Sequence, residues 1–167
     1  MARRAVVIRD ANLTDFPAIL ALNAESVRFL SPLDAGRLAE LHQQASYHRV
    51  IDSPDGVAGF MLAFADNAIY NSPNYGWFAA RYRGFVYIDR VVVAAAARKQ
   101  GFARMLYEDV WEHAKRIGAA TVTCEIDVLP PNPESLSFHE RLGFLEVGQQ
   151  QVGAKRVSLC ARPVSRS

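Results

Sequence analysis

The residues with the clearest chemical potential lie at positions 91–106, where a strand, a turn and the start of a helix are expected. The apolar run Val-Val-Val at 91–93 precedes a basic turn, Arg-Lys-Gln-Gly-Phe-Ala-Arg, at 98–104. A helix start leaves backbone N–H groups without partners and carries the positive end of the helix dipole, so phosphates bind there. The pattern indicates either a phosphate-binding turn or an ordinary strand-to-helix turn with solvated basic side chains.

Two better-known phosphate loops do not fit this sequence. The chain contains no G-x-x-x-x-G-K-[ST] pattern, which nucleotide hydrolysis would need, and no G-x-G-x-x-G pattern, which marks dinucleotide-binding folds. Neither nucleotide hydrolysis nor Rossmann-type dinucleotide binding is therefore expected.

Two separated segments resemble the signatures of one family. Arg-Lys-Gln-Gly-Phe-Ala at 98–103 matches the [Q/R]-x-x-G-x-[G/A] pyrophosphate motif of the GNAT acyltransferase superfamily. Residues 132–144 resemble its second signature: an Asn, a small residue three positions on, an aromatic residue and a final Leu-Gly-Phe. The order of the expected elements agrees over nearly the whole chain. The resemblance implies a GNAT N-acetyltransferase that uses acetyl-CoA as co-substrate.

The resemblance also implies which residues bind the coenzyme. Backbone groups at 91–93 would contact the pantetheine arm and the thioester, on a strand that splays from its neighbour, and the same residues can serve as core. Asn132 would either hydrogen-bond the pantetheine arm or cap the helix that begins at Pro133. The expected coenzyme-binding residues are Val91, Val92, Val93, Arg98, Lys99, Gln100, Gly101, Phe102, Ala103, Arg104, Asn132, Ser135 and His139.

Acetyl transfer from a thioester to an amine requires two proton movements. An alkylammonium group, with a pKa of about 10.4, must lose a proton before it attacks. The departing thiolate, whose thiol has a pKa of about 8.5, benefits from an acid. Glu125, on the polar side of a strand expected at 121–128, resembles the base of some relatives, which acts through water. Asp89, two residues before Val91, is the competing base, and solvent is the third alternative.

His139 stands where the family pattern has a tyrosine acid. An imidazole with an unperturbed pKa of about 6.5 is mostly deprotonated at neutral pH, although its neutral form still donates one N–H. Three interpretations stay open: His139 is the acid, it holds the thiolate electrostatically, or it is an exposed helix residue. The missing tyrosine also motivates an alternative function, a sensor or scaffold that binds acyl-CoA with weak or no turnover.

Two segments are candidates for binding the amine acceptor. The aromatic segment 71–83 offers apolar and cation-binding rings, which equally suit a small core or a dimer contact. The segment 24–34, after the first expected helix, offers polar groups for a small acceptor. We expect the acceptor to be a primary amine of a small molecule or a peptide. The predicted acceptor-binding residues are Arg28, Ser31, Tyr75 and Trp77.

These residues need a mixed framework to position them. Strands are expected at 5–9, 50–64 (a hairpin around 53–56), 85–93, 121–128, 145–152 and 156–162; helices at 16–22 (capped by Thr14 or Asp15), 37–42, 102–117 and 133–142; and an irregular stretch at 66–83. This order predicts an α/β (α+β) fold of the GNAT type. Its twisted, mostly antiparallel mixed sheet has about 6–7 strands, flanked by about four helices and splayed between the two central strands.

Composition limits the remaining possibilities. A chain of 167 residues, half of them hydrophobic, suits a single domain spanning 1–167. The formal net charge of +2 is too small to favour nucleic-acid binding. The start of the chain lacks a signal or membrane-spanning run, so a cytoplasmic protein without a membrane partner is expected. Family habit and the aromatic segment favour a homodimer.

The cysteines and histidines carry two further expectations. Cys124 and Cys160 fall in expected strands and should be buried core residues rather than a disulfide. His42, His48 and His113 lack the spacing of metal ligands, so no metal is expected.

Overall fold

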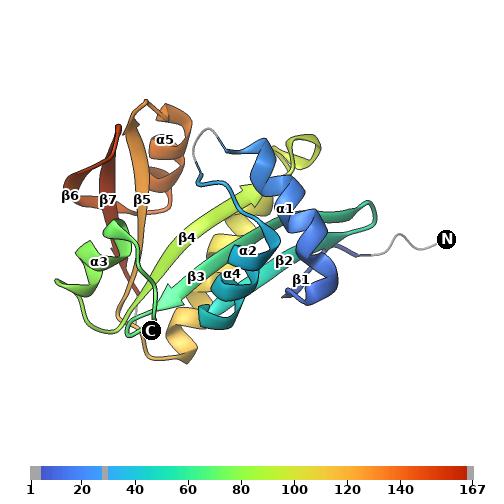
Figure 1. The fold of residues 1–167 in the computed structure, drawn as a ribbon, viewed down its shortest axis with the longest axis horizontal. Coiled ribbons are helices and arrows are strands. Elements are labelled where there is room, and N and C mark those ends of the chain that lie inside the picture. Colours follow the sequence, from blue (N-terminus) through green and yellow to red (C-terminus); the bar gives the residue numbers. More distant parts are fainter. Residues whose placement is uncertain (1–4, 28–29, 165–167) are drawn as a thin grey trace. The chain divides into compact units, whose positions relative to one another are not determined.

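The computed structural model describes residues 5–27 and 30–164, and it confirms the predicted fold class (Figure 1). Within the described residues the elements are β1 (Val7–Asp10), the 3-10 turn η1 (Leu13–Asp15), α1 (Phe16–Glu25), α2 (Ala35–Gln44), β2 (Tyr47–Ser53), β3 (Gly56–Ala65), α3 (Pro73–Ala79), β4 (Phe85–Val93), η2 (Ala95–Ala97), α4 (Phe102–Arg116), β5 (Thr121–Leu129), α5 (Pro133–Arg141), β6 (Leu145–Val152) and β7 (Lys155–Pro163). The sheet has seven strands in the order β1-β2-β3-β4-β5-β7-β6. Of the strand pairs described in register, only β4 with β5 is parallel.

The chain forms two compact units. The first combines residues 1–64 with 89–113, and the second combines 65–88 with 114–167. Strand β4 and helix α4 each contribute residues to both units. The splay expected between β4 and β5 stays a prediction, as does the single domain over 1–167.

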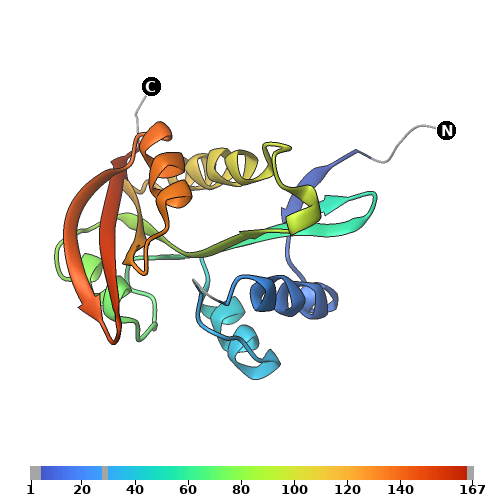
Figure 2. The same cartoon turned by 90° about the horizontal axis from the view of Figure 1, so that it is seen from above.

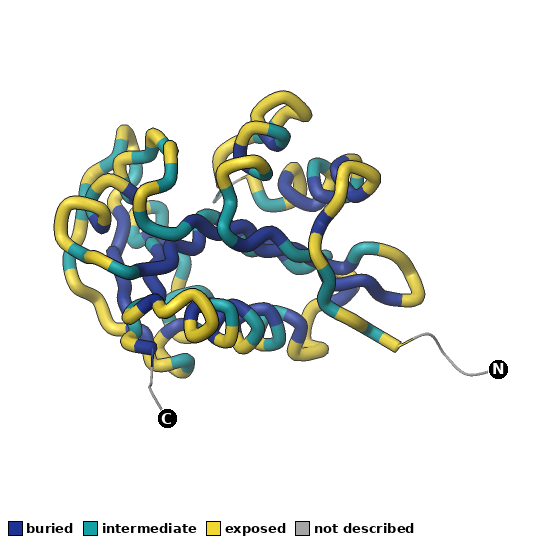
Figure 3. Tube along the Cα trace, turned by 90° about the horizontal axis from the view of Figure 1, so that it is seen from below, coloured by how far each residue is buried: buried dark blue, intermediate teal, exposed yellow. Residues whose placement is uncertain are grey.

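Helices cover both faces of the strands in the first unit. Helices α1 and α2 lie on one face of β2 and β3, and α4 lies on the other (Figure 2). Strands covered on both faces should be apolar throughout, and β3 is buried without interruption from Ala58 to Phe64. Figure 3 shows the same result as a dark run along the central strands. The predicted hairpin around residues 53–56 is confirmed.

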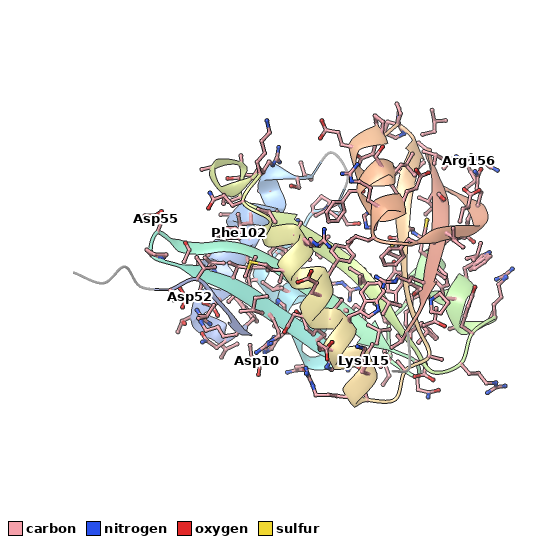
Figure 4. All side chains as sticks on the ribbon, turned by 180° about the vertical axis from the view of Figure 1, so that it is seen from behind. Asp10, Asp52, Asp55, Phe102, Lys115 and Arg156 are labelled. Carbon is pink, nitrogen blue, oxygen red and sulfur yellow. The ribbon has the colours of Figure 1, made fainter. Side chains whose placement is uncertain are left out.

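Asp15, one of the two predicted caps, is the N-cap residue of helix α1, although its side chain makes no capping bond to that helix. Asn12 starts the preceding 3-10 turn by accepting from Thr14 N, and Asp15 accepts from Asn12 N at 2.9 Å. Arg9 binds Asp15 and also Asp52, at 2.8 and 3.0 Å. Figure 4 labels Asp52 on β2. These bonds lower the pKa of the Asp15 carboxyl, with the Arg9 contact as the main cause. The sequence reasoning missed this ion-paired junction between β1, β2 and the helix start.

A pair of histidines lies beneath the helices of the first unit. The Nδ1 atoms of His42 and His48 are 2.7 Å apart, so one of them carries a proton and the other accepts it. The ring of Phe16 packs edge-on against His42. Burial, and then the neighbouring His42, lower the pKa of His48 to about 4, although Asp15 opposes the shift. The folded protein therefore holds His48 neutral well below the pH at which a free histidine protonates.

Stability should consequently depend on pH in a window set by His48. Above the unfolded-state pKa of 6.5, His48 is neutral in both states and no stability is lost through its protonation. As the pH falls from 6.5 to about 4, His48 becomes protonated in the unfolded chain but stays neutral in the folded chain. The free energy of unfolding should drop by up to about 1.4 kcal/mol per pH unit in this window. Urea unfolding of the wild type and of His48→Leu at several pH values measures it. Equal pH slopes for the two proteins would contradict the assignment.

The second unit contains a helix where irregular structure was expected. Residues 73–79 form α3, so the part of the chain that the structure describes has five α-helices rather than about four. Ser72 caps the helix by accepting from Tyr75 N, and Pro73 occupies its first turn. The prediction was wrong because Asn, Pro and Gly in this stretch indicated irregular structure, although Ser followed by Pro is also a helix-start signal.

Strand β5 is buried on both faces. Cys124 and Cys160 face each other across β5 and β7, and both are buried free thiols in the described chain, as predicted. On the side predicted to be polar, Thr123 is fully buried and donates to Val86 O. Asp127 on the same side pairs with Lys155. The polar face of β5 is therefore packed against neighbouring residues, and its polar side chains are paired rather than solvated.

Candidate functional site

The basic turn of the first unit leads from β4 through η2 into α4. Residues 98–101 are all exposed, while Phe102 anchors the helix start in the core. Lys99 and Gly101 both have positive φ, at 66° and 78°. A left-handed conformation costs a non-glycine residue roughly 1–2 kcal/mol, and such residues cluster where ligands are held. The backbone before the helix thus adopts an uncommon conformation at two of its positions.

The amides of this turn are suited to an anion. The hydrogen bonds of α4 begin with Met105 N donating to Gly101 O at 3.0 Å, and the amides before Met105 have no carbonyl of the helix to bond. A Cβ placed on Gly101 would meet no heavy atom of the described residues within 4 Å, so the approach is open. Arg104 pairs with Glu108 at 3.1 Å, but both side chains are about two-thirds exposed. Such surface pairs are weak, so a phosphate can displace the carboxylate.

Strand β4 reaches this turn in close contact with β3. Ala94 N donates to Ala58 O at 2.8 Å. A Cβ built on Gly59 would lie 2.7 Å from Val92 O, closer than real Cβ contacts. Val92 is buried, whereas Val91 and Val93 are half-buried. The absence of a side chain at position 59 therefore permits the backbone of 92–93 to approach β3 this closely.

The candidate base Asp89 is held in a buried ion pair. Its Oδ2 lies 2.7 Å from Arg90 Nε, and the two side chains are only 5% and 6% exposed. Arg90 Nη1 also donates to Asn23 Oδ1 at 3.0 Å and to the Ser31 carbonyl at 3.2 Å. The structure thus brings Ser31, a predicted acceptor residue, to the residue next to Asp89. Arg28, the other predicted acceptor residue in this segment, lies outside the described residues.

In the second unit, the candidate base Glu125 is bonded to a tyrosine that the sequence reasoning missed. Tyr87 OH donates to Glu125 Oε2 at 2.6 Å. The parallel register places Tyr87 opposite Thr123, so Glu125 is the next residue along on the same face. Tyr87 is fully buried and its ring packs on Tyr75 at 5.6 Å. Glu125 is half-buried and held by a rigid donor.

His139 is a buried residue of α5, so its interpretation as an exposed helix residue is wrong. It is 7% exposed and packs edge-on against Phe144. Its Nδ1 lies 2.7 Å from the Ser135 carbonyl, and because a carbonyl only accepts, Nδ1 carries the proton. Burial lowers the pKa of His139, while the bond to Ser135 raises it by less. The neutral ring thus donates its one N–H within the helix.

Asn132 stands at the N-cap position of α5, directly before Pro133. Among the described residues its side chain makes no capping hydrogen bond, and its backbone carbonyl accepts from Leu136 N at 3.1 Å. Ser135 lies one turn before His139, with its hydroxyl 3.3 Å from His139 Nδ1. The side chain of Asn132 is therefore not committed to the cap that its position suggested.

The two predicted aromatic acceptor residues pack inside the second unit. Tyr75 is 4% exposed, and its hydroxyl donates to Ala65 O and accepts from Ala68 N. Trp77 lies over Gly148 of β6, where a Cβ would come within 2.5 Å of the indole ring. Arg81 stacks on that ring at 4.0 Å. These contacts agree with the packing interpretation of the segment rather than with an open acceptor wall.

Two general features of the described chain are negative. None of its helices is long and apolar enough to cross a membrane. Residues 5–27 and 30–164 also contain no group of three His, Cys, Asp or Glu side chains arranged to hold a metal ion.

Comparison with known proteins gives one consistent result. The sequence model described as "Acetyltransferase (GNAT) family" matches residues 14–144. The aminoglycoside N(6')-acetyltransferase type 1 of Serratia marcescens is 30% identical over 103 residues, which are 61% of this chain and 66% of that protein. The chain thus spans just under two thirds of that relative's length.

Solved structures share the fold. Ard1 from Thermoplasma volcanium has a TM-score of 0.80 at 16% identity, covering 98% of this chain and 100% of its own. The structure of yncA from Salmonella typhimurium with its cofactor acetyl-CoA has a TM-score of 0.73 at 22% identity, covering 98% and 96%. With a family match over most of its length and this fold, the chain belongs to the GNAT family of acetyltransferases.

Proposed function

We propose that the protein transfers an acetyl group from acetyl-CoA to a primary amine of a small molecule or peptide, by direct attack in a ternary complex. The observation that carries this proposal is the turn at residues 98–104, with its positive φ angles at Lys99 and Gly101 and its open amides. The acetyl-CoA in the yncA structure and the aminoglycoside activity of the Serratia marcescens relative support the donor and the acceptor class.

The coenzyme would be held mainly by backbone groups. Acetyl-CoA supplies the activated acetyl thioester. The amides of 101–104 would bind its pyrophosphate, with Lys99 and Arg104 as cationic partners, because N–H groups at a helix start and nearby cations both favour phosphate. The backbone at 91–93 would bind the pantetheine arm, and Asn132 stays a predicted coenzyme-binding residue.

Glu125 is the proposed base. A base must accept a proton, and Asp89 is poorly suited because its carboxylate is committed to the buried Arg90. Glu125 is half-buried and its Oε2 accepts from Tyr87, so this oriented carboxylate is the proposed acceptor of the amine proton, directly or through water. Tyr87 acts through Glu125, so it is a positioning residue rather than a catalytic one.

Removing the Tyr87 hydroxyl should therefore lower the rate. In Tyr87→Phe the Glu125 carboxylate loses a hydrogen bond worth about 1.5–3 kcal/mol and is no longer held in one orientation. We expect kcat to fall roughly tenfold, while the calorimetric Kd for acetyl-CoA stays unchanged. Thr123→Val, which removes a buried hydroxyl from the same pair of strands, is the control. Equal kcat in Tyr87→Phe and wild type would contradict the positioning role.

His139 is not proposed as the acid. Its lowered pKa keeps the ring neutral, and its N–H is already donated to Ser135 O, so the proton for the thiolate comes from solvent. We expect His139→Phe to keep kcat within about threefold of wild type across the pH range, since solvent still supplies the proton. A loss of about 100-fold in kcat, together with loss of the basic limb, would restore the acid role.

The experiment that tests the function measures binding and turnover separately. The purified chain is titrated with acetyl-CoA by calorimetry. It is then assayed for thiol release with a panel containing a simple alkylamine, an aminoglycoside and a peptide with a free N-terminus. Thiol release matched by acetylated amine supports the proposal, and intersecting initial-velocity lines support the ternary complex. Binding without release for every amine would instead indicate the acyl-CoA sensor or scaffold.

A further inference from the structure

We propose that Arg90 is a positioning residue for the amine acceptor, which it controls by fixing the backbone at Ser31 against β4. The network consists of Asp89, Arg90, Asn23 and the Ser31 carbonyl, and we call it the Arg90 network. The inference rests on the proposed function, because it assigns a role in selecting the amine that the enzyme acetylates.

The contacts converge on a single carbonyl. Arg90 Nη1 donates to Ser31 O at 3.2 Å, and Asn23 Nδ2 donates to the same oxygen at 3.0 Å. Asn23 Oδ1 in turn accepts from Arg90 Nη1 at 3.0 Å. Asn23 lies on α1 and is 1% exposed, so the three groups form a closed triangle in the interior. The position of Ser31 is therefore set by two buried side chains from different elements.

This arrangement depends on the shape of arginine. Nε of the guanidinium binds Asp89 while Nη1 reaches both Asn23 and Ser31. A lysine ammonium is a single point charge on a flexible stem and cannot reproduce this fork. Arg90→Lys should keep the charge balance with Asp89 but release the carbonyl, which separates positioning from electrostatics.

The location of the network gives it a consequence for the reaction. Arg90 directly precedes Val91, the first residue proposed to hold the thioester arm. Ser31 is exposed, and so is Asp34, which caps α2 by accepting from Arg37 N at 2.8 Å. The segment from Ser31 to Asp34 thus runs from the Arg90 network to the start of α2 with polar groups open to solvent. An amine with hydroxyl or amino substituents would find hydrogen-bonding partners on it.

The buried charge is also compatible with a cationic acceptor. Asp89 neutralises Arg90 within the network at 2.7 Å. An unpaired guanidinium next to the acceptor would repel an ammonium group, since like charges a few ångströms apart interact strongly in a low-dielectric region. The ion pair therefore lets arginine do the positioning without opposing the binding of the substrate.

The test compares Arg90→Lys and Asn23→Ala with wild type on the amine panel. We expect KM for the amines to rise about tenfold and the order of preference among them to change. The calorimetric Kd for acetyl-CoA should stay within about twofold, and kcat at saturating amine should change less than KM. A purely structural role of Arg90 would not raise the KM for the amine while leaving the Kd for acetyl-CoA unchanged.

Arg49→Lys is the matched control. Arg49 also forms a partly buried ion pair in the first unit, with Asp109 at 2.8 Å, and it takes no part in the Arg90 network. It should lower the melting temperature without changing the amine KM. If Arg90→Lys and Asn23→Ala behave like Arg49→Lys, the inference is overturned while the proposed function stands. If wild type binds acetyl-CoA but acetylates no amine, the proposed function fails, and this inference fails with it.

Discussion

Glu125→Gln should lower kcat about 100-fold or more while leaving the calorimetric Kd for acetyl-CoA unchanged. A positioned base contributes about 10²–10⁴-fold to a reaction of this kind, and the amide cannot take the proton from an ammonium group. Glutamine has the same shape and still accepts the bond from Tyr87, so the folded structure should persist. The measurement is steady-state thiol release at saturating amine, with melting temperature recorded alongside.

Asp127→Asn is the control for this loss. Asp127 lies two residues further along β5 on the same face, and it pairs with Lys155 at 3.2 Å. Its substitution removes a buried carboxylate from the same face of β5 but should leave kcat close to wild type. If Glu125→Gln retains turnover while the Asp127 variant loses it, the base has been assigned to the wrong carboxylate. If neither variant loses activity, Glu125 is not the base, and Asp89 or solvent takes that role.

Charge reversal in the turn should produce the largest loss of binding. Lys99→Glu combined with Arg104→Glu removes two cations from the proposed pyrophosphate site, each worth about 1.5–3 kcal/mol as a charged hydrogen bond. We expect the Kd for acetyl-CoA to rise about 100-fold or more. The fold should survive, because Lys99 and Arg104 are both exposed and the surface pair of Arg104 with Glu108 contributes little. Calorimetry at low and moderate salt measures the change, and salt should weaken wild-type binding more.

A charge-matched control lies at the other end of the same helix. Lys115→Glu combined with Arg116→Glu makes the same change in net charge at the exposed C-terminal end of α4. This variant should bind acetyl-CoA almost as wild type does, since those residues are remote from the helix start. The turn does not bind the coenzyme if the turn variant keeps its affinity for acetyl-CoA, or if both double variants lose affinity equally.

Patterns local in the sequence were sufficient for most of the framework. The β-branched run of β4 and the apolar face of α4 predicted both elements to within a residue. Helix α3 was missed because Ser72 and Pro73 are equally typical of a loop and of a helix start. The packing of Tyr75 and Trp77 within the second unit decides between the two. Local signals therefore fail where one residue type serves both loops and helix starts.

The site was less predictable because its important contacts join distant residues. Tyr87 and Glu125 are brought together by the register of two parallel strands, which composition does not specify. Asn23 and Arg90 are 67 positions apart, and they bond to each other and to the same backbone carbonyl. A backbone carbonyl has no sequence signature. The Ser135–His139 bond was the exception, since a spacing of four residues in a helix places the two groups together.

The close approach of β3 to β4 at Gly59 limits how this enzyme can be redesigned. The atom that a Cβ would strike is the carbonyl oxygen of Val92, which is part of the backbone. Every amino acid carries that oxygen, so no replacement at position 92 can relieve the collision. A saturation library at position 59, selected for activity, should return glycine alone. Efforts to admit bulkier acyl donors should therefore begin with side chains elsewhere and leave this pair of strands untouched.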